Sequence, residues 1–410
     1  MNRISGKIYL ISLAVLFTIP LVFFPSAASS TEYTFTPIDV PGSTVTQAYG
    51  INNSGNIVGL YGDATGGQRY GFLYVGGSFT PIDVPGSSLT YAYGINVFGS
   101  IVGYYEGATG GPYGFLDAGG DFTTINVPGS SYTYAYAIND SGNIVGVYRD
   151  STGTGHGFFY AGGDFTTINV PGSYQTYAYG INNSDSIVGV YQATTGGFYS
   201  FLDVGGTFTT INVPGSSYTY AYGINDSGNI VGVYGDTAGA EHGFLYVGGS
   251  FTTINVPGAT LTRAFGINDS GNIVGTYNDA MGAGHGFLAT PVPEPVAIDI
   301  EPWFKPNIIG WKFKWAPIPV AILSKPGFDA PKMIDEASLT FGHNGDENSL
   351  AFCSPLSIDV NGDKARDLIC LFYTGKAGFQ CHDTAGILKG KTQDGTPIEG
   401  GDSVKIVPCK

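Results

Sequence analysis

Four oxygen-bearing side chains near the C-terminus have a spacing that suits a metal ion. They occupy positions one, three, five and nine of one short segment: Asp359, Asn361, Asp363 and Asp367. The backbone carbonyl of Ala365 falls at position seven. Ca²⁺ binds about six to eight oxygens from carboxylates, amides and carbonyls. The segment therefore predicts a calcium site, and a turn built by Asp and Asn side chains is the alternative interpretation.

The same segment resembles the calcium loops of dockerin and integrin-type repeats, and the resemblance implies Ca²⁺ as a bound ion. It departs from those loops at two positions. Lys364 stands where a Gly usually follows the third ligand, and Cys370 stands at position twelve, where no Glu is available. Lys364 and Arg366 also offset part of the negative charge, so the segment predicts a low affinity.

A second set of candidate residues lies in glycine-rich loops before residue 290. Six acidic residues and three histidines occur in or next to these loops: Asp63, Glu106, Asp150, His156, Asp236, Glu241, His242, Asp279 and His285. We expect them to contribute to a surface that binds a glycan or a protein. The alternative is a carboxylate pair for glycoside hydrolysis, which requires a separation of about 5 Å or about 6.5–9.5 Å. Sequence spacing does not define such a separation.

These loops recur because the chain repeats. Val-Pro-Gly begins at six positions, spaced by 44 and then by 43 residues: Val40, Val84, Val127, Val170, Val213 and Val256. Each copy contains four runs of β-branched and aromatic residues bounded by Gly, Pro, Asn and Asp, which predicts four short strands. Four antiparallel strands every ~40–45 residues are typical of propeller blades. Residues 33–289 therefore predict a six-bladed β-propeller.

The order of the runs also predicts how the ring closes. The sixth copy ends near Leu288 without its last strand, and residues 33–40 supply an unused strand. Pairing these two segments would remove two free sheet edges. The alternative, an open solenoid, would need capping copies of different sequence. We expect an all-β ring in which the N-terminal strand completes the last blade.

Two residue types recur at fixed places in the copies. An Asn follows Ile in all six: Asn52, Asn96, Asn139, Asn182, Asn225 and Asn268. We expect each side chain to bond backbone groups of the next turn; a ring of amides around a channel and glycan acceptors are the alternatives. Tyrosines at alternate positions of the preceding run, such as Tyr91 and Tyr93, favour core packing over a sugar-stacking platform. The three histidines stand where other copies have Tyr, which predicts an aromatic wall and argues against a symmetric metal site.

The string Gly-Ile-Asn-Asp-Ser-Gly-Asn-Ile-Val-Gly, followed about ten residues later by His-Gly-Phe-Leu, resembles the HAF-repeat family of extracellular bacterial proteins. In this chain Gly replaces the Ala of the His-Ala-Phe tripeptide. Tyr70, Tyr113 and Tyr199 replace the His in three copies. The resemblance covers about 260 residues. It implies secretion and repetition, and it implies no known reaction.

The composition changes beyond Pro291. The first Trp and all four cysteines lie there, together with β-rich runs and no helical pattern. We expect a Pro-rich linker at 290–296 and a β-sandwich at 297–410. This part resembles an accessory module appended to many exported prokaryotic proteins, which implies a surface-associated role. The cysteines predict two disulfides in one of three pairings: Cys353, Cys370, Cys381 and Cys409.

The charge and the N-terminus indicate where the protein acts. The net charge is −15, and residues 31–290 hold 17 Asp and Glu against three Arg, which argues against nucleic acid as a partner. Arg3 and Lys7, the apolar run 8–24 and the small residues before Ser29 predict a secretory signal cleaved after Ala28. A retained membrane anchor is the alternative. We expect a secreted or cell-surface protein, with the periplasm also open, and no transmembrane helix after cleavage.

No nucleophile–base motif, phosphate loop or zinc-protease motif occurs in the sequence. The leading hypothesis is therefore an exported, non-catalytic repeat protein whose propeller binds a glycan or a protein. The first alternative is a polysaccharide-acting lyase or hydrolase with its site in the axial mouth of the propeller. The second alternative is a purely structural component of a surface or matrix.

Overall fold

The computed structural model describes residues 32–63, 68–107, 110–310 and 314–408. The predicted signal segment, residues 1–28, and Cys409 lie outside the described residues. Within the described ranges nearly all regular structure is β-strand, and one helix of four residues occurs, α1 (Ala330–Met333). This confirms the prediction of an all-β fold.

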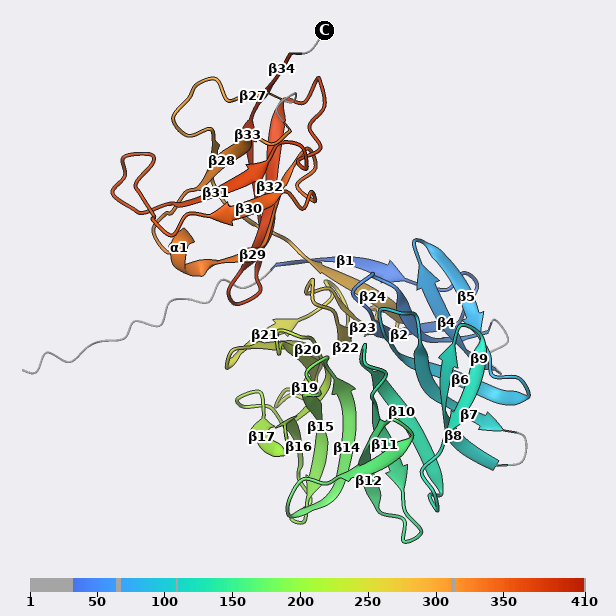
Figure 1. Ribbon diagram of the computed structural model, residues 1–410. Coiled ribbons are helices and arrows are strands. Elements are labelled where there is room, and N and C mark those ends of the chain that lie inside the picture. The colour runs from blue at the N-terminus through green and yellow to red at the C-terminus, as the bar shows by residue number, and fades with distance from the viewer. Residues whose placement is uncertain (1–31, 64–67, 108–109, 311–313, 409–410) are drawn as a thin grey trace, which may run out of the picture. The chain divides into compact units, whose positions relative to one another are not determined.

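Residues 33–291 form six sheets of four antiparallel strands each, which we call blades 1 to 6 (Figure 1). Blade 1 contains β2 (Val45–Ile51), β3 (Ile57–Gly62), β4 (Arg69–Val75) and β5 (Ser78–Ile82). Blade 2 contains β6 (Ser87–Ile95), β7 (Ile101–Gly107), β8 (Gly110–Ala118) and β9 (Asp121–Ile125). Blade 3 contains β10 (Tyr132–Ile138), β11 (Ile144–Arg149), β12 (Gly155–Ala161) and β13 (Asp164–Ile168).

The second half of the ring repeats this order. Blade 4 contains β14 (Ser173–Ile181), β15 (Ile187–Ala193), β16 (Phe198–Val204) and β17 (Thr207–Ile211). Blade 5 contains β18 (Tyr218–Ile224), β19 (Ile230–Gly235), β20 (Glu241–Val247) and β21 (Ser250–Ile254). Blade 6 contains β22 (Leu261–Ile267), β23 (Ile273–Asn278), β24 (Gly284–Pro291) and, from the N-terminus, β1 (Tyr33–Ile38).

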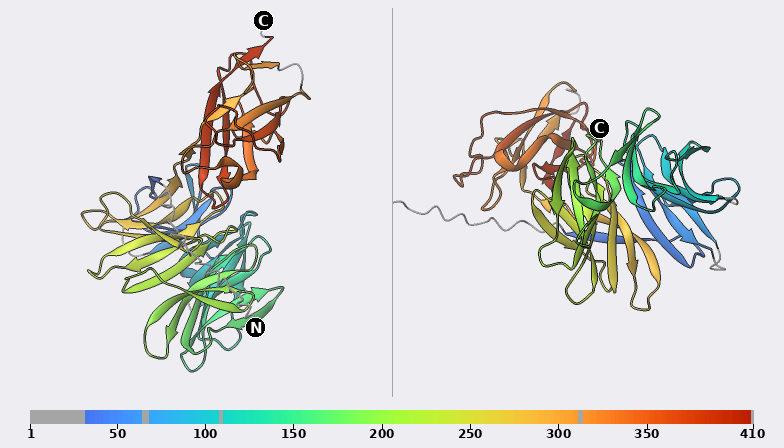
Figure 2. Two further views of the ribbon diagram at one scale, coloured as in Figure 1. Left: turned by 90° about the vertical axis from the view of Figure 1, so that its left-hand side faces the viewer. Right: turned by 90° about the horizontal axis from the view of Figure 1, so that it is seen from below.

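The ring closes as the order of the repeats predicts. β1 pairs antiparallel with β24, and Phe35 lies opposite Ala289. The first strand of each blade contacts the first strands of both neighbouring blades, including the pair β2 and β22. The six sheets therefore surround one axis, as the views along and across the ring show (Figure 2). An open solenoid would lack the contact between β2 and β22.

Neighbouring blades are held together by one repeated apolar cluster. In the first interface, Val58 of blade 1 packs with Ala92 and Phe115 of blade 2, and all three side chains are buried completely. The central Gly of Ile-Val-Gly makes room for this packing. A Cβ atom on Gly59 would lie 2.0 Å from the Gln47 carbonyl oxygen and 2.7 Å from the Phe72 ring. Because such contacts are too short, the second strand requires Gly at this position.

A β-bulge in every inner strand turns one side chain toward the axis. In blade 1, Ala48 pairs with Gly59 and Gly50 pairs with Val58, so Tyr49 is the extra, unpaired residue. The same shift occurs in the inner strands of the other five blades. A bulge re-aims side chains relative to the regular alternation of a strand. The bulge therefore explains why one aromatic residue per blade departs from simple inside–outside alternation.

The C-terminal module contains two four-stranded sheets. One has the order β25 (Glu294–Pro295), β33 (Pro397–Ser403), β32 (Ala385–Thr392) and β29 (Ile334–Gly342). The other has the order β26 (Ile298–Ile300), β28 (Pro317–Ile322), β31 (Leu368–Tyr373) and β30 (Leu350–Cys353). A short parallel pair joins β27 (Ile308–Gly310) to β34 (Lys405–Val407). Residues of both sheets share one buried cluster, including Phe341 and Phe372, and a β-sandwich remains the prediction for their packing.

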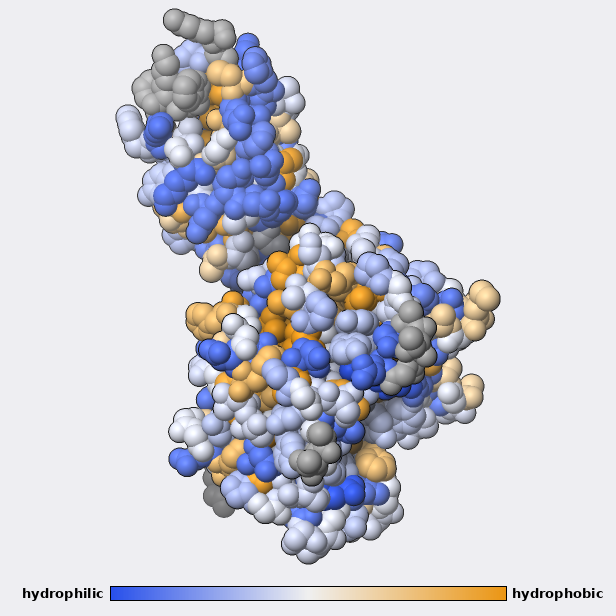
Figure 3. All heavy atoms as spheres, turned by 90° about the vertical axis from the view of Figure 1, so that its right-hand side faces the viewer, coloured by the Kyte–Doolittle hydropathy of each residue, from blue (hydrophilic) through white to orange (hydrophobic). Residues whose placement is uncertain are grey.

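The segment expected as a linker contains strand residues at both of its ends. β24 continues to Pro291 and pairs there with Tyr33, and Glu294 pairs in parallel with Ile398 of β33. In the described part of the chain, no helix is long and apolar enough to span a membrane. On the face shown in Figure 3, the C-terminal module is mostly hydrophilic, whereas polar and apolar residues are mixed over the propeller.

Candidate functional site

The two ends of the propeller carry different sets of turns. Because consecutive antiparallel strands turn at opposite ends, the turns after the inner strands and the Gly-Gly turns share one end. The glycine-rich loops and the Val-Pro-Gly connections share the other end. We call the first the asparagine end, defined by residues 52–56 and their equivalents. We call the second the loop end, defined by residues 62–69 and 83–87 and their equivalents.

A cavity of about 300 Å³ opens at the loop end between blades 4 and 5. Phe198 and Tyr199, at the start of β16, form its aromatic wall, with 40% and 36% of their surface exposed. The connection from Asn212 to Thr219 supplies the rest of the lining. The cavity therefore combines accessible aromatic rings with amide and hydroxyl groups, the combination that is typical of small-molecule sites.

The polar groups of this cavity differ in whether they already have a hydrogen-bond partner. Ser216 Oγ donates to the carbonyl of Val213 at 2.8 Å, and Ser217 Oγ donates to the carbonyl of Gly235 at 3.0 Å. Within the described ranges, the side-chain amide of Asn212 has no hydrogen-bond partner and is exposed to solvent. An amide offers two donors and one acceptor. Asn212 is therefore a polar group of this cavity that is free to bind a ligand.

The position of Tyr199 is aromatic in every blade. The six residues are Tyr70, Tyr113, His156, Tyr199, His242 and His285. Each ring lies against a Tyr of the neighbouring second strand, with centroids 5.1–5.9 Å apart. His and Tyr therefore replace one another at one position of the blade, where each ring contacts a Tyr of the same blade. The cavity of blade 4 is thus built on a position that recurs six times.

The predicted site residues Asp150 and His156 form a local bridge. His156 Nε2 lies 3.1 Å from Asp150 Oδ2, and His156 Nδ1 lies 3.0 Å from Asn169 Oδ1. The other oxygen of Asp150 accepts bonds from the hydroxyl and N–H of Thr152 and from the N–H of Thr154. These bonds, from Thr152 first and then from His156, lower the pKa of Asp150. The Asp150 side chain thus stabilises the loop to which it belongs through hydrogen bonds to Thr152 and Thr154.

Two further blades repeat this bridge. His242 Nε2 lies 3.4 Å from Asp236, whose Oδ1 accepts the N–H groups of residues 238 and 240. His285 lies between two carboxylates, 3.0 Å from Asp39 and 3.7 Å from Asp279. Backbone bonds, above all from residues 240 and 283, lower the pKa values of Asp236 and Asp279. The predicted Asp and His residues are therefore brought together within their own blades.

Glu241 is engaged by a different pair of side chains. It accepts a bond from Arg263 Nε at 2.7 Å and one from the Tyr218 hydroxyl at 2.5 Å. Burial acts to raise the pKa of Glu241, but the bonds from Tyr218 and Arg263 outweigh it and lower the pKa. Glu106 lies exposed on β7, and the backbone N–H of Asp63 donates to the carbonyl of Gln68. None of the six predicted acidic residues, all within the described ranges, lines either of two cavities of about 90 Å³ on the propeller axis, one among the repeated Asn turns and one among the inner-strand aromatic residues.

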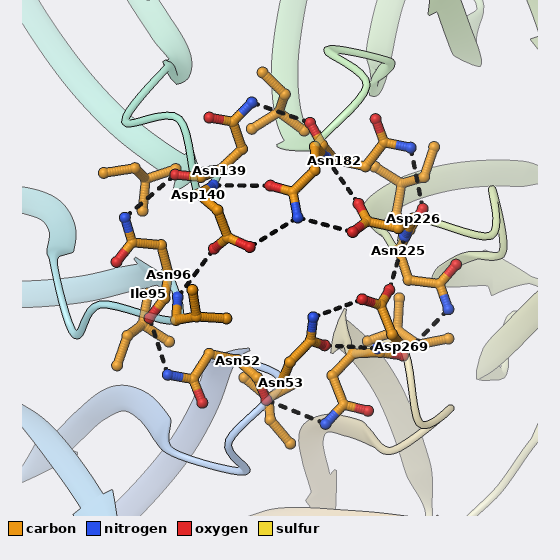
Figure 4. Close-up of a pocket in the computed structure, with 18 residues that line it drawn as sticks. Asn52, Asn53, Ile95, Asn96, Asn139, Asp140, Asn182, Asn225, Asp226 and Asp269 are labelled. Atoms are coloured by element: carbon orange, nitrogen blue, oxygen red, sulfur yellow. Dashed lines mark hydrogen bonds between the residues drawn. The ribbon is translucent and has the colours of Figure 1, made fainter. Parts of the chain in front are cut away.

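The asparagine end is closed by a ring of side-chain amides (Figure 4). Each amide nitrogen donates to the carbonyl of the equivalent Asn in the next blade, from Asn52 to Asn96 at 2.9 Å and finally from Asn268 back to Asn52 at 3.1 Å. The four intervening bonds measure 3.1–3.2 Å. Each side-chain oxygen accepts N–H groups of its own turn, as in Asn52 with Ser54 and Asn56.

This arrangement decides between the interpretations of the repeated Asn. The predicted bonds to the following turn are present, and so are the bonds between blades that complete the ring of amides named as an alternative. The six side chains are 3–6% exposed and fully engaged, so they do not suit glycan attachment. The next residue of each turn adds a second set of contacts nearer the centre of the ring (Figure 4), such as Asp226 Oδ1 accepting the N–H of Asn183 at 2.8 Å. The amides form a ring around the axis that joins the blades.

Six aromatic rings surround the axis nearer the loop end. They are Tyr49, Tyr93, Tyr136, Tyr179, Tyr222 and Phe265, and their centroids follow one another at 4.5–5.2 Å around a closed circle. Burial raises the pKa of each of the five tyrosines. The prediction that these tyrosines pack against other side chains is confirmed for this set, because each ring contacts the next one around the axis.

The predicted calcium segment is folded by its own backbone bonds. Asp359 accepts the N–H groups of Gly362 and Lys364, and Asp363 accepts that of Ala365. Asp367 is fully buried and accepts the N–H groups of Ser324 and Val360, both at 2.8 Å. In the described part of the chain, no three acidic, His or Cys side chains are grouped in a way that suits a metal ion. Calcium binding therefore stays a prediction.

Cys353 and Cys370 form a disulfide between β30 and β31. Cys381 is also disulfide-bonded, and Cys409 lies outside the described residues. The bridge between Cys353 and Cys370 belongs to one of the three pairings that the sequence left open. It ties the strand before the predicted calcium segment to the strand after it.

Sequence reasoning missed part of the cavity at the loop end. It named the loop before Phe198 and the Tyr at 199, but it did not name Asn212 or Ser217 as site residues. A signal was present, because an Asn or Asp precedes each Val-Pro-Gly by one position. The register of β16 and β17 places Ser200 opposite Ile211, which brings the start of one strand to the end of the other.

No model of a known protein family matches the chain, and no curated protein matches it. Among solved structures, a lectin of Aleuria aurantia described as a six-bladed β-propeller has 16% identity and a TM-score of 0.39, covering 63% of this chain and 93% of that one. AofleA from Arthrobotrys oligospora has 12% identity and a TM-score of 0.39, covering 72% and 86%. An aldose sugar dehydrogenase of Streptomyces coelicolor has 11% identity and a TM-score of 0.38, covering 63% and 98%. At these scores the likenesses carry no argument about a ligand.

Proposed function

We propose that this chain is a non-catalytic carbohydrate-binding protein whose propeller binds sugar at the loop end. The observation that carries the proposal is the cavity between blades 4 and 5. Its aromatic wall, Phe198 and Tyr199, lines the same cavity as the free amide of Asn212. Aromatic rings offer a flat apolar surface for the C–H face of a sugar ring, and amides bond hydroxyl groups. Both requirements meet in one hollow of about 300 Å³.

The repetition of the aromatic position supports binding through several weak contacts. Six blades present Tyr or His at this place, so one polymer is able to meet more than one of them. Linked weak sites raise the overall affinity by factors of about 10²–10⁴ when their geometry permits simultaneous binding. In the three His blades the ring is bridged to Asp, and in blade 4 the Tyr is free of such a bridge. We therefore expect the blades to differ in affinity, with blade 4 among the stronger.

The carboxylates of the loop end support a role without catalysis at that end. Asp150, Asp236 and Asp279 close their own loops, and Glu241 is paired with Arg263. A hydrolase would need two carboxyl groups facing one cavity. The described residues provide no such pair in the cavity of blade 4, which contains no acidic side chain.

The test is retention on immobilised neutral and acidic polysaccharides, with assay of new reducing or unsaturated ends. We expect retention without new ends, and we expect Tyr199→Ala to weaken it at least about tenfold, which corresponds to about 1.4 kcal/mol. Phe98→Ala is the matched control, because Phe98 is 77% exposed at the asparagine end. Equal retention of Tyr199→Ala and wild-type protein would contradict the proposal, and turnover of a polymer would replace it with the hydrolase or lyase alternative.

We further propose that the protein acts outside the cytoplasm. The pattern of residues 1–28 and the disulfides of the C-terminal module support this, since disulfides persist in oxidising compartments. The test is fractionation of cells that produce the full chain, followed by N-terminal sequencing. A mature protein beginning at Ser29 outside the cytoplasm is expected. Retention of the full chain in the cytoplasm would contradict the proposal.

Calcium binding by residues 359–367 is a separate proposal, supported by the spacing of the oxygen-bearing side chains. Each carboxylate oxygen of Asp359 and Asp363 that accepts a backbone N–H keeps a second lone pair that can bind the ion. Calorimetric titration of the full chain with CaCl₂ is expected to give heat that the Asp363→Ala variant lacks. Absence of heat from the wild-type protein, with both proteins equally stable, would remove the proposal.

A further inference from the structure

A second cavity, of about 460 Å³, lies in the C-terminal module and is lined by cationic side chains. Lys325 and Lys332 border it beside α1, and Arg366 borders it from the segment before β31. Asp329 is the acidic residue in the lining. The chain as a whole has 32 acidic and 17 basic residues. The cavity thus has the opposite charge balance to the rest of the protein.

The three cations are not equivalent. Lys332 is paired with Asp329 at 2.5 Å, and Lys325 lies 3.7 Å from Glu294 and above the ring of Phe328. Arg366 is exposed, and within the described ranges its guanidinium has no ion-pair or hydrogen-bond partner. Its main chain is held in place, because the Arg366 carbonyl accepts a bond from Ser324 Oγ at 2.7 Å. A guanidinium on a fixed backbone is thus left open to an anion.

We propose that this cavity binds an acidic sugar residue, with Arg366 holding its carboxylate. The planar guanidinium offers paired N–H donors that match the two oxygens of a carboxylate. Lys325 and Lys332 add positive charge at the rim. The volume exceeds what a bare ion needs and lies within the range of about 300–1,000 Å³ found for small-molecule sites. The hydroxyl of Ser357 and the edge of Phe328 give the remaining lining a polar and an apolar part.

This site is independent of the proposed function of the propeller. The two cavities lie in different parts of the chain and share no residue. The propeller cavity is lined by neutral side chains, so it has no group that selects for a carboxylate. Failure of neutral sugar binding would leave the anion site untouched, and the reverse also holds.

The test is calorimetric titration of the full mature chain, in calcium-containing buffer, with oligogalacturonate, neutral dextran and poly-glutamate. We expect Arg366→Gln to weaken oligogalacturonate binding at least about tenfold relative to wild type. Lys405→Gln removes the same charge from an exposed site outside the cavity and is expected to change binding less than about twofold. Thermal unfolding of both variants shows whether the fold is kept, and Lys332→Gln gives a second cavity variant for the same comparison.

Three results would overturn the proposal. Equal weakening by Arg366→Gln and Lys405→Gln would show attraction by overall charge. Equal affinity for poly-glutamate and oligogalacturonate would show that the sugar ring is not recognised. Absence of binding to oligogalacturonate by the wild-type chain would remove the site.

Discussion

The two ends of the propeller use the same blades for different purposes. At the asparagine end one residue is the same in all six turns, and its side chain joins each blade to the next. At the loop end the equivalent positions differ, with Tyr in three blades and His in three. The Asn common to every blade therefore stabilises the ring, and the aromatic position that varies lies where ligands have access. The comparison teaches that repetition alone is a poor guide to a binding site.

The sharpest contrast within one strand is between Phe201 and Phe198 of β16. Phe201 is fully buried between blades, and Phe198 is 40% exposed at the loop end. Phe201→Ala is expected to lower the free energy of unfolding by about 3–5 kcal/mol, because it leaves a cavity in the blade interface. Phe198→Ala is expected to lower it by less than about 1 kcal/mol and to weaken glycan retention. Denaturant unfolding of both variants, with the retention assay, measures both effects. A large loss of stability in Phe198→Ala would contradict the view that Phe198, unlike Phe201, contributes little to the stability of the fold.

Two asparagines give the next largest contrast. Asn182→Ala removes the bond to the Asn225 carbonyl and the bonds from the N–H groups of Ser184 and Ser186. Because these groups are left without partners, we expect a loss of roughly 2–4 kcal/mol with retention unchanged. Asn212→Ala removes an exposed amide, so we expect a change below about 0.5 kcal/mol with weaker retention. If Asn182→Ala abolished retention in folded protein, the asparagine end would belong to the binding site.

The smallest expected effect concerns Glu241, a loop-end residue that the sequence analysis named as a candidate binding residue and that pairs with Arg263. Its pKa is lowered, so its contribution to stability is present above its ordinary pKa of about 4.3 and is lost as the pH falls through the lower, folded-state value. Glu241→Gln is expected to cost about 0.5–1 kcal/mol at pH 7 and less at pH 3. Chemical denaturation at both pH values measures the difference.

Glu106→Gln is the control for this prediction, since Glu106 is exposed on β7 and lies outside the pair with Arg263. We expect no pH-dependent difference for it. A Glu241→Gln difference that was equal at both pH values would show that the contribution of the pair does not depend on the charge of Glu241.

The blades could be predicted from the sequence because their signals are local. The Ile-Val-Gly runs and the turns at Gly and Asn define strands and their ends, and the unused segment 33–40 defines the closure that β1 and β24 show. The sequence suggested the amide ring only as an alternative, because five of its bonds join residues 43 or 44 positions apart and the closing bond joins Asn268 to Asn52. The role of Tyr49 and its equivalents was also hidden, since a bulge breaks the alternation from which faces are read.

The sequence predicted which residues belong to the candidate site better than it predicted the contacts between them. The sequence pointed to the loops and to Asp150 and His156, and these two side chains do meet. It did not show that they bond each other within one loop, or that the accessible cavity is lined by Phe198, Tyr199 and Asn212. Those contacts depend on which strand ends lie side by side. That information resides in the register of the sheet.

The most direct test of the account is a hydrogen-exchange footprint of the mature chain with and without a retained polysaccharide. The account predicts slower exchange in peptides that cover residues 198–200 and 212–219, with no change at the turns 96–100 and 182–186. Slower exchange confined to those turns, at the asparagine end, would contradict the claim that the variable end of the propeller binds the ligand.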